Sequence, residues 1–303
     1  MPIQPQDIVQ TGSLELLAKK AVEGFITGFH KSPFQGYSVE FAEHRQYNMG
    51  ESTKHIDWKL YARTDKLYNK QYDDETNLRC HFLVDVSSSM QIKQAGLLTK
   101  LQFALYVTAS FLELLRKQRD ASSLCLFDNQ VREFTKVSSS SRHYRELFTK
   151  MEEYLTFSSQ QKRTDISQTL HQIASQVQRR GLIILFTDFF DHNPSNQRLF
   201  DAIRHLKHHK HEVIVFHVLH HDTELHFDFG TTPLHLEDAE TGERLKVLPS
   251  EIALSYREAM THFTTQLVME FQQYKIDYIP INTANSVEEA IIPFLTKRKR
   301  MRA

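Results

Sequence analysis

Four apolar runs of strand length, alternating with helical stretches, constrain the fold of this 303-residue chain more than any other feature. Each run is apolar at most of its positions, so both of its sides must be buried. Strands of this kind that alternate with helices form a parallel sheet that is covered by helices on both faces. The runs are RCHFLVD (79–85), SLCLFD (123–128), GLIILFTD (181–188) and HEVIVFHVL (211–219).

Shorter patterns complete the predicted architecture. The segment FDNQVREF (127–134) combines a tight turn with a short alternating run, which predicts one antiparallel edge strand. Late in the chain a long amphipathic helix precedes DYIPIN (277–282), which indicates a last strand. Ser286 and Glu289 have the spacing of a capping box, so a final helix should begin here, and Pro293 should kink or restart it.

The predicted fold class is therefore α/β, a doubly wound, mostly parallel sheet with one antiparallel edge strand and a small β-rich subdomain. Short polar and aromatic segments from Tyr37 to about Asn77 indicate the subdomain. The predicted divisions are an N-terminal helix and β-rich subdomain over 1–78, the sheet domain over 79–222 and 249–298, a β excursion over 223–248 that joins the subdomain, and a basic tail over 299–303.

Composition excludes several kinds of partner. Lysine plus arginine and aspartate plus glutamate are balanced at 37 each, so no overall field draws the chain to nucleic acid. No window approaches the roughly 18 uncharged apolar residues of a spanning helix, so we expect no stable membrane insertion. The two cysteines, Cys80 and Cys125, lie in apolar runs, which favours a reducing compartment, by default the cytoplasm. The sequence indicates no oligomeric state.

Polar side chains follow the ends of the predicted strands, where open α/β sheets bind their ligands. Asp85, Ser87 and Ser89 follow the first run as D-x-S-x-S, Asp188 follows the third, and Thr164 stands just before a helix. Carboxylate and hydroxyl oxygens form a hard ligand set that suits Mg²⁺ or Mn²⁺. Because only two ligands are anionic, such an ion would keep affinity for one more carboxylate, supplied by a partner.

These residues resemble the metal-ion-dependent adhesion site of von Willebrand factor A domains. The preceding region, KSPFQGYSVEFAEHRQYNMGESTKHIDWKLYARTDKLYNKQYDDET, resembles the signature of the bacterial family known as domain of unknown function number fifty-eight. The resemblance implies a von Willebrand factor A-like fold, a magnesium site, and a protein partner that is a MoxR-type AAA ATPase or its client. The chain would then be a non-catalytic adaptor in chaperone-like complex assembly. Relatives usually have glycines before the threonine, where this chain has Gln161–Arg163.

Other interpretations of the same residues remain open. D-x-S-x-S is also a common turn sequence, and Asp188 or Asp191 could cap a helix. A magnesium-dependent phosphotransferase of the haloacid-dehalogenase kind also has an aspartate at a strand end and a later acidic pair, here Asp188 and Asp191. That chemistry needs a second acid two residues after the nucleophile, and position 87 is a serine.

Two further features are assigned structural roles. Trp58, beside Asp57 and Arg63, is interpreted as an aromatic anchor that ties the β-rich layer to the sheet, with a buried ion pair. The histidines of RHLKHHKHEVIVFHVLHH (204–221) do not have the spacing of a metal site. We expect them to be solvated at a helix end.

Overall fold

The computed structural model describes residues 13–28, 41–46, 57–72, 78–94, 96–157, 166–189, 196–208, 210–237 and 244–300. The chain divides into two compact units. The larger unit comprises Met1–Ser32 and Leu78–Ala303, and the smaller unit comprises Pro33–Asn77.

A six-stranded sheet forms the centre of the larger unit, in the order β10-β7-β6-β3-β4-β5. All neighbouring strands are parallel except β4 and β5, which are antiparallel. This arrangement confirms the predicted doubly wound sheet with one antiparallel edge strand and agrees with a von Willebrand factor A-like fold. The strands are β3 (Arg79–Asp85), β4 (Ala121–Phe127), β5 (Val131–Phe134), β6 (Leu182–Thr187), β7 (Glu212–Leu219) and β10 (Asp277–Asn282).

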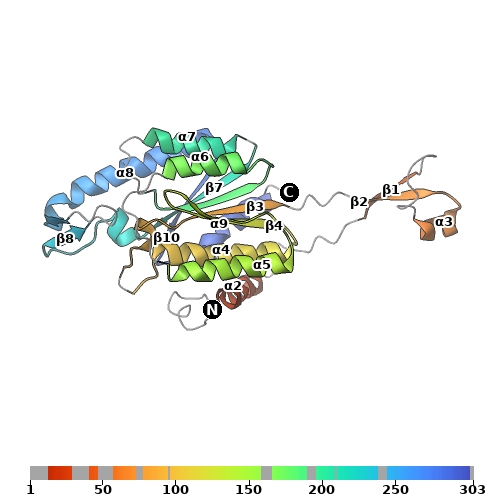
Figure 1. Ribbon diagram of the computed structural model, residues 1–303, viewed down its shortest axis with the longest axis horizontal. Helices are drawn as coiled ribbons and strands as arrows, with labels where there is room; N and C mark the ends of the chain where they lie inside the picture. The colour runs from red at the N-terminus through yellow and green to blue at the C-terminus, as the bar shows by residue number, and fades with distance from the viewer. Residues whose placement is uncertain are drawn as a thin grey trace. The chain divides into compact units, whose positions relative to one another are not determined.

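The order of the strands creates a switch point between β3 and β6. The chain enters the sheet at β3, builds outward through β4 to β5, and then returns to pair β6 with the other side of β3. The helices that follow β3 and β6 therefore lie on opposite faces of the sheet, α4 on one and α7 on the other (Figure 1). Their connections diverge at the carboxyl ends of the two strands, which is where open sheets of this class bind ligands.

Helices cover both faces of the sheet (Figure 1). On one face the core joins the central strands to α6, α7 and α8. On the other face Phe111 of α4 stacks edge-on against Phe294 of α9, with ring centroids 4.9 Å apart. Within the described residues, no helix combines the length and apolar character needed to cross a bilayer. The helices are α4 (Lys100–Lys117), α5 (Ser141–Leu155), α6 (Ile166–Gln176), α7 (Asn196–Lys207), α8 (Pro249–Gln273) and α9 (Val287–Arg300).

The N-terminal helix α2 (Leu14–Gly28) belongs to the larger unit, whereas the sequence analysis grouped it with the β-rich subdomain. Its apolar face is buried, and its first turn is held by two polar contacts. The backbone N–H of Leu14 donates to Glu152 Oε1 at 2.7 Å, and Arg116 Nη1 donates to Glu15 Oε1 at 2.7 Å. The helix lies on α4 because its amphipathic stripe needs an apolar surface, which the helical layer provides.

The predicted β excursion contains an antiparallel hairpin of β8 (Leu234–Glu237) and β9 (Arg244–Val247). It lies in the larger unit rather than in the subdomain to which it was assigned from the sequence.

The final helix begins as predicted, with Ser286 Oγ accepting the backbone N–H of Glu289 at 3.3 Å. It is one continuous helix to Arg300, so Pro293 does not restart it and the helix extends into the predicted basic tail.

The smaller unit contains the two-stranded sheet of β1 (Phe41–Gln46) and β2 (Tyr68–Tyr72) and the short helix α3 (Trp58–Thr64). Asp57 is the N-cap of α3, because its Oδ1 accepts the backbone N–H groups of Lys59 and Leu60. Trp58, which we expected to be a buried aromatic anchor, is 60% exposed, and its ring lies edge-on to Tyr61 of the same helix with ring centroids 6.2 Å apart. Its position in the first turn of a helix with no buried residue explains the difference.

Gly181, which precedes β6, is a position where a side chain would disrupt the sheet. A Cβ atom there would lie 2.6 Å from the backbone oxygen of Arg79 on β3. We expect Gly181→Ala to lower the free energy of unfolding by about 1–3 kcal/mol, because backbone must move. Urea denaturation measures the loss. Gly96→Asn is the control, since φ is +79° and no atom lies within 4 Å of its Cβ position, and asparagine tolerates this conformation. Equal losses in both variants would contradict the steric explanation.

Candidate functional site

Asp85 ends the central strand β3 and is completely buried. Both oxygens of its carboxyl group accept hydrogen bonds. The backbone N–H of Ser87 donates to Oδ1 at 2.9 Å, and the hydroxyl of Thr187, at the end of β6, donates to Oδ2 at 2.7 Å. Asp85 therefore shapes the turn after its own strand and connects that turn to the neighbouring strand.

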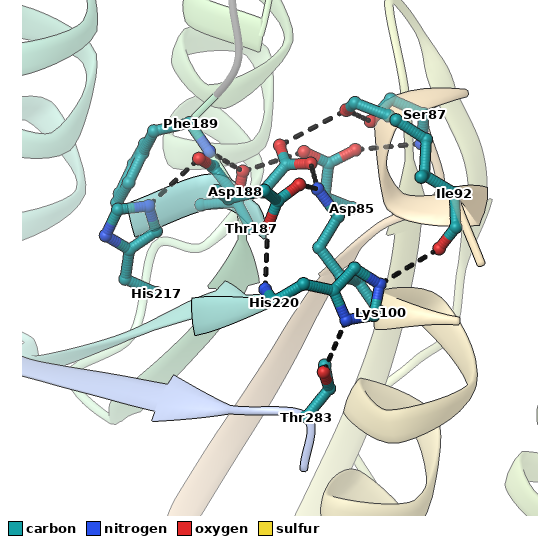
Figure 2. A network of polar contacts seen from close by, with 12 residues as sticks. Asp85, Ser87, Ile92, Lys100, Thr187, Asp188, Phe189, His217, His220 and Thr283 are labelled. Carbon is teal, nitrogen blue, oxygen red and sulfur yellow. Dashed lines mark hydrogen bonds and ion pairs between the residues drawn. The ribbon is translucent and has the colours of Figure 1, made fainter. Parts of the chain in front are cut away.

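A row of hydrogen bonds connects the two predicted serines to the second aspartate (Figure 2). The hydroxyl oxygens of Ser87 and Ser89 lie 3.1 Å apart, and Ser89 Oγ donates to Asp188 Oδ1 at 3.2 Å. All three residues are buried. The structure thus brings together Asp85, Ser87, Ser89 and Asp188, as the sequence predicted from their positions at strand ends. Thr164 and Asp191 lie outside the described residues.

Asp188 is held at the end of β6 by a strained turn and a buried histidine. Phe189 has a φ of 56°, a left-handed conformation that costs energy for a residue with a Cβ atom. Its backbone N–H donates to the hydroxyl of Thr187 at 3.2 Å. His217 on β7 lies with Nε2 3.0 Å from the backbone oxygen of Asp188. These contacts fix the direction of the Asp188 side chain toward the serines.

Lys100 and Glu224 also belong to the site, and neither was predicted from the sequence. The ammonium nitrogen of Lys100 lies 2.7 Å from Asp188 Oδ2 and 2.5 Å from Glu224 Oε1. Lys100 begins α4, and Glu224 lies in the π-helical turn η3 (His221–Leu225) that follows β7. Two features of the sequence could have indicated these residues: a lysine stands at the start of an apolar helix, and a glutamate stands soon after a strand.

Burial and charge set the protonation of the site. Burial is the main cause that raises the pKa of Asp85 to about 7, and the negative charge of Asp188 acts in the same direction. Hydrogen bonds from Ser87 and Thr187 oppose this rise. Burial alone would lower the pKa of Lys100, but the carboxylates of Asp188 and Glu224 outweigh it and hold that pKa above its ordinary value. Lys100 is therefore an ammonium at neutral pH.

Two histidines that we expected to be solvated are buried around the site. Burial lowers the pKa of His217 to about 4 and also lowers the pKa of His220, so both rings are neutral. A neutral His217 that donates to the Asp188 carbonyl accepts from the Tyr278 hydroxyl at Nδ1, at 2.6 Å. His211 is also buried, and its Nδ1 accepts the backbone N–H of Gly181. The prediction of solvated histidines is wrong for these three residues, which lie on or beside a buried strand, whereas His208 just after the end of α7 is exposed.

The donor atoms present fit a hard cation in their chemistry. Asp188 Oδ1 and the hydroxyls of Ser87 and Ser89 are neighbouring oxygen atoms, and no sulfur or imidazole joins them. No group of three or more His, Cys, Asp or Glu side chains able to hold a metal occurs among the described residues. Two of the proposed donors are serines, and the nearby cationic group is the Lys100 ammonium, which contacts the other oxygen of Asp188.

The fold and the site define a doubly wound α/β domain with a buried polar cluster at its switch point. The family model described as "Protein of unknown function DUF58" matches residues 43–265, and the chain belongs to this family. This result confirms the family resemblance seen in the sequence.

Curated relatives match over a shorter segment. An uncharacterised protein of Mycobacterium tuberculosis and one of Mycobacterium bovis are each 30% identical to this chain over 83 residues. The matched segment covers 27% of this chain and 26% of each relative.

Solved structures with related arrangements are more distant in sequence. An aerotolerance-related membrane protein from Bacteroides fragilis is 17% identical, with a TM-score of 0.46 over 73% of this chain and 99% of that chain. BatB from Bacteroides thetaiotaomicron, described as a conserved hypothetical protein, is 14% identical, with a TM-score of 0.41 over 74% of this chain and 99% of that chain.

Proposed function

We propose that this protein is a non-catalytic adaptor of the cytoplasm that recognises an acidic side chain of a protein partner through Mg²⁺ or Mn²⁺. The observation that carries the proposal is the row of oxygen atoms from Ser87 through Ser89 to Asp188 Oδ1. These atoms would hold the ion, and Asp85 would hold the turn that positions them. The ion would supply a directional bond to a partner's carboxylate, and surrounding contacts would set the affinity.

The hydrogen bonds of Asp85 favour a binding role over a phosphotransferase role. A nucleophilic carboxylate needs an oxygen directed at its substrate and a nearby acid for the leaving group. Both oxygens of Asp85 accept hydrogen bonds from the chain itself, and position 87 supplies a serine hydroxyl. The arrangement therefore supports Asp85 as a residue that organises the site.

The proposed partner is a MoxR-type AAA ATPase or its client. This part of the proposal comes from the family resemblance of the sequence, and the charge of the site makes it chemically specific. The described site has more carboxyl groups than ammonium groups, so it would not attract an acidic partner without an added cation. Binding should therefore depend on the divalent ion.

Removal of the two hydroxyls tests the proposal. We expect Ser87→Ala/Ser89→Ala to fold, to lose at least about tenfold in Mn²⁺ affinity, and to lose magnesium-dependent capture of the MoxR-type ATPase encoded in the source genome. Electron paramagnetic resonance of free Mn²⁺ measures the affinity, and co-purification with Mg²⁺ or EDTA measures the capture.

The matched control is Ser175→Ala/Ser255→Ala, which removes two exposed helical hydroxyls that bond to their own helix backbone. This control should behave as the wild type in both measurements. Capture that is equal in Mg²⁺ and EDTA, or equal in the wild type and the Ser87→Ala/Ser89→Ala variant, would overturn the proposed mechanism.

A further inference from the structure

Lys100 is a fully buried cation placed directly on the proposed metal site. Its side chain is 0% exposed, and its ammonium bridges Asp188 Oδ2 at 2.7 Å and Glu224 Oε1 at 2.5 Å. Figure 2 shows the lysine side chain reaching from α4 toward Asp188. Lysine is almost never fully buried unless it is paired, so the two carboxylates account for its position.

The start of α4 aims Lys100 into the site. Thr99 is the N-cap, and it forms a reciprocal capping box with Gln102. Lys100 is thus the first helical residue, at the helix end whose exposed N–H groups disfavour a positive charge. The local helix does not explain a cation here, and the stabilisation comes from Asp188 and Glu224.

Glu224 is anchored independently of Lys100. Its second oxygen, Oε2, accepts the backbone N–H of His220 at 2.7 Å, and its carbonyl accepts the Tyr256 hydroxyl at 2.9 Å. The His220 ring lies between Thr283 and the backbone of Ile92, with Nε2 3.1 Å from the Ile92 oxygen and Nδ1 2.5 Å from Thr283 Oγ1. Glu224 can therefore retain the ammonium if the contact with Asp188 is lost.

The two oxygens of Asp188 have different partners. Oδ1 accepts from Ser89 and belongs to the row of candidate metal donors, while Oδ2 contacts the Lys100 ammonium. A divalent ion on Oδ1 and an ammonium on Oδ2 would be close like charges in a buried site, where repulsion is strong. Occupation by the ion should therefore weaken or break the Lys100–Asp188 contact.

We propose that Lys100 is a built-in competitor of the divalent cation, which neutralises Asp188 when no ion is bound and shifts toward Glu224 when one binds. This inference rests on the proposed function and adds a residue that regulates it. Lys100 would lower the affinity of the site, so that the ion binds firmly only when a partner's carboxylate completes its shell.

Replacement of the lysine tests the inference. We expect Lys100→Met to bind Mn²⁺ at least about tenfold more tightly than the wild type, because the competing charge is gone. We also expect a lower melting temperature in EDTA and a larger rise on addition of Mg²⁺ than in the wild type. Paramagnetic resonance and calorimetry measure the two effects. Lys117→Met, at the exposed opposite end of α4, is the matched control and should behave as the wild type.

A charge-conserving variant keeps the test decisive if Lys100→Met fails to fold. Lys100→Gln/Glu224→Gln removes one positive and one negative group, so the net charge of the site is unchanged. It should still bind Mn²⁺ more tightly than the wild type, because the competitor for Asp188 is absent. Affinity equal to or weaker than that of the wild type, in whichever lysine variant folds, would overturn the inference.

The outcomes separate this inference from the proposed function. Binding of Mn²⁺ by the wild type with no gain in the lysine variants overturns the competition and leaves the proposed function standing. Binding only by the lysine variants supports the competition, and the proposed function is then overturned only if capture by the wild type is equal in Mg²⁺ and EDTA. No binding by any of these proteins overturns the competition, and together with capture that is equal in Mg²⁺ and EDTA it overturns both.

Discussion

Replacement of Asp188 by alanine is expected to lower the free energy of unfolding by about 3–5 kcal/mol, because it removes one partner of a buried ion pair. Asp188 and Lys100 both have fully buried side chains, and the ammonium lies 2.7 Å from Oδ2. Glu224 would retain the ammonium, but it already contacts Lys100 in the wild type, so the attraction of Asp188 is lost without replacement. Urea denaturation at pH 7 in EDTA measures the loss.

A double-mutant cycle identifies the source of this loss. If the ion pair is the cause, Asp188→Ala combined with Lys100→Met should lose less stability than the sum of the two single variants. Asp222→Ala, an exposed position in the turn that contains Glu224, should change the free energy of unfolding by less than about 0.5 kcal/mol. Strictly additive losses from Asp188→Ala and Lys100→Met would contradict the coupling.

The sheet was predictable because its strands are apolar on both sides. β3 and β6 are continuous apolar runs with an aspartate at or just after their ends. The composition of such a run and the spacing of its apolar residues suffice to identify it as a strand. The turn after β4 likewise identified the antiparallel edge strand. The placement of α2 was not predictable, since an amphipathic stripe shows that a helix is packed and does not show against which surface.

The site was predictable only in part, for a related reason. Asp85, Ser87, Ser89 and Asp188 come together because the carboxyl ends of adjacent parallel strands share one edge of the sheet. Lys100 reaches the same place from the first turn of a helix, and its length is what allows the contact. The register of a helix against a sheet is set by packing, which leaves no short motif in the sequence.

The histidines illustrate the same limit of local patterns. A cluster of histidines near a helix end looks solvated in sequence, yet His217 and His220 lie at buried positions on and just after β7. Each ring connects two segments of the chain. The His217 ring connects β7 to the Asp188 backbone, and the His220 ring connects the residue just after β7 to the Ile92 backbone. Their role depends on contacts distant in sequence, so it becomes visible only in the folded chain.

The stability of the metal-free protein should depend on the protonation of Asp85. Burial raises the pKa of this carboxyl from 3.8 to about 7 in the folded chain, so the folded state binds its proton more tightly than the unfolded state. This contribution is fully present below about pH 4 and is lost as the pH rises through about 7. We expect it to change the free energy of unfolding by at most about 1.4 kcal/mol per pH unit within that window.

Comparison with Asp85→Asn isolates this contribution, because asparagine has nearly the same shape and does not titrate. Burial lowers the pKa of His81 and His217 to about 4, so these rings are neutral in the folded chain and reduce its stability as the pH falls below about 6.5. This pH dependence is opposite to that of Asp85 and occurs in an overlapping pH range. The wild type and Asp85→Asn share these histidines, so the histidine contribution cancels in the difference between their free energies of unfolding. In EDTA, this difference should favour the wild type more strongly at pH 4 than at pH 7, and Asp222→Asn should follow the wild type. A difference that is constant from pH 4 to pH 7 would show that Asp85 stays ionised in the folded chain, and the buried cluster would then carry one more negative charge for Lys100 or a divalent ion to balance.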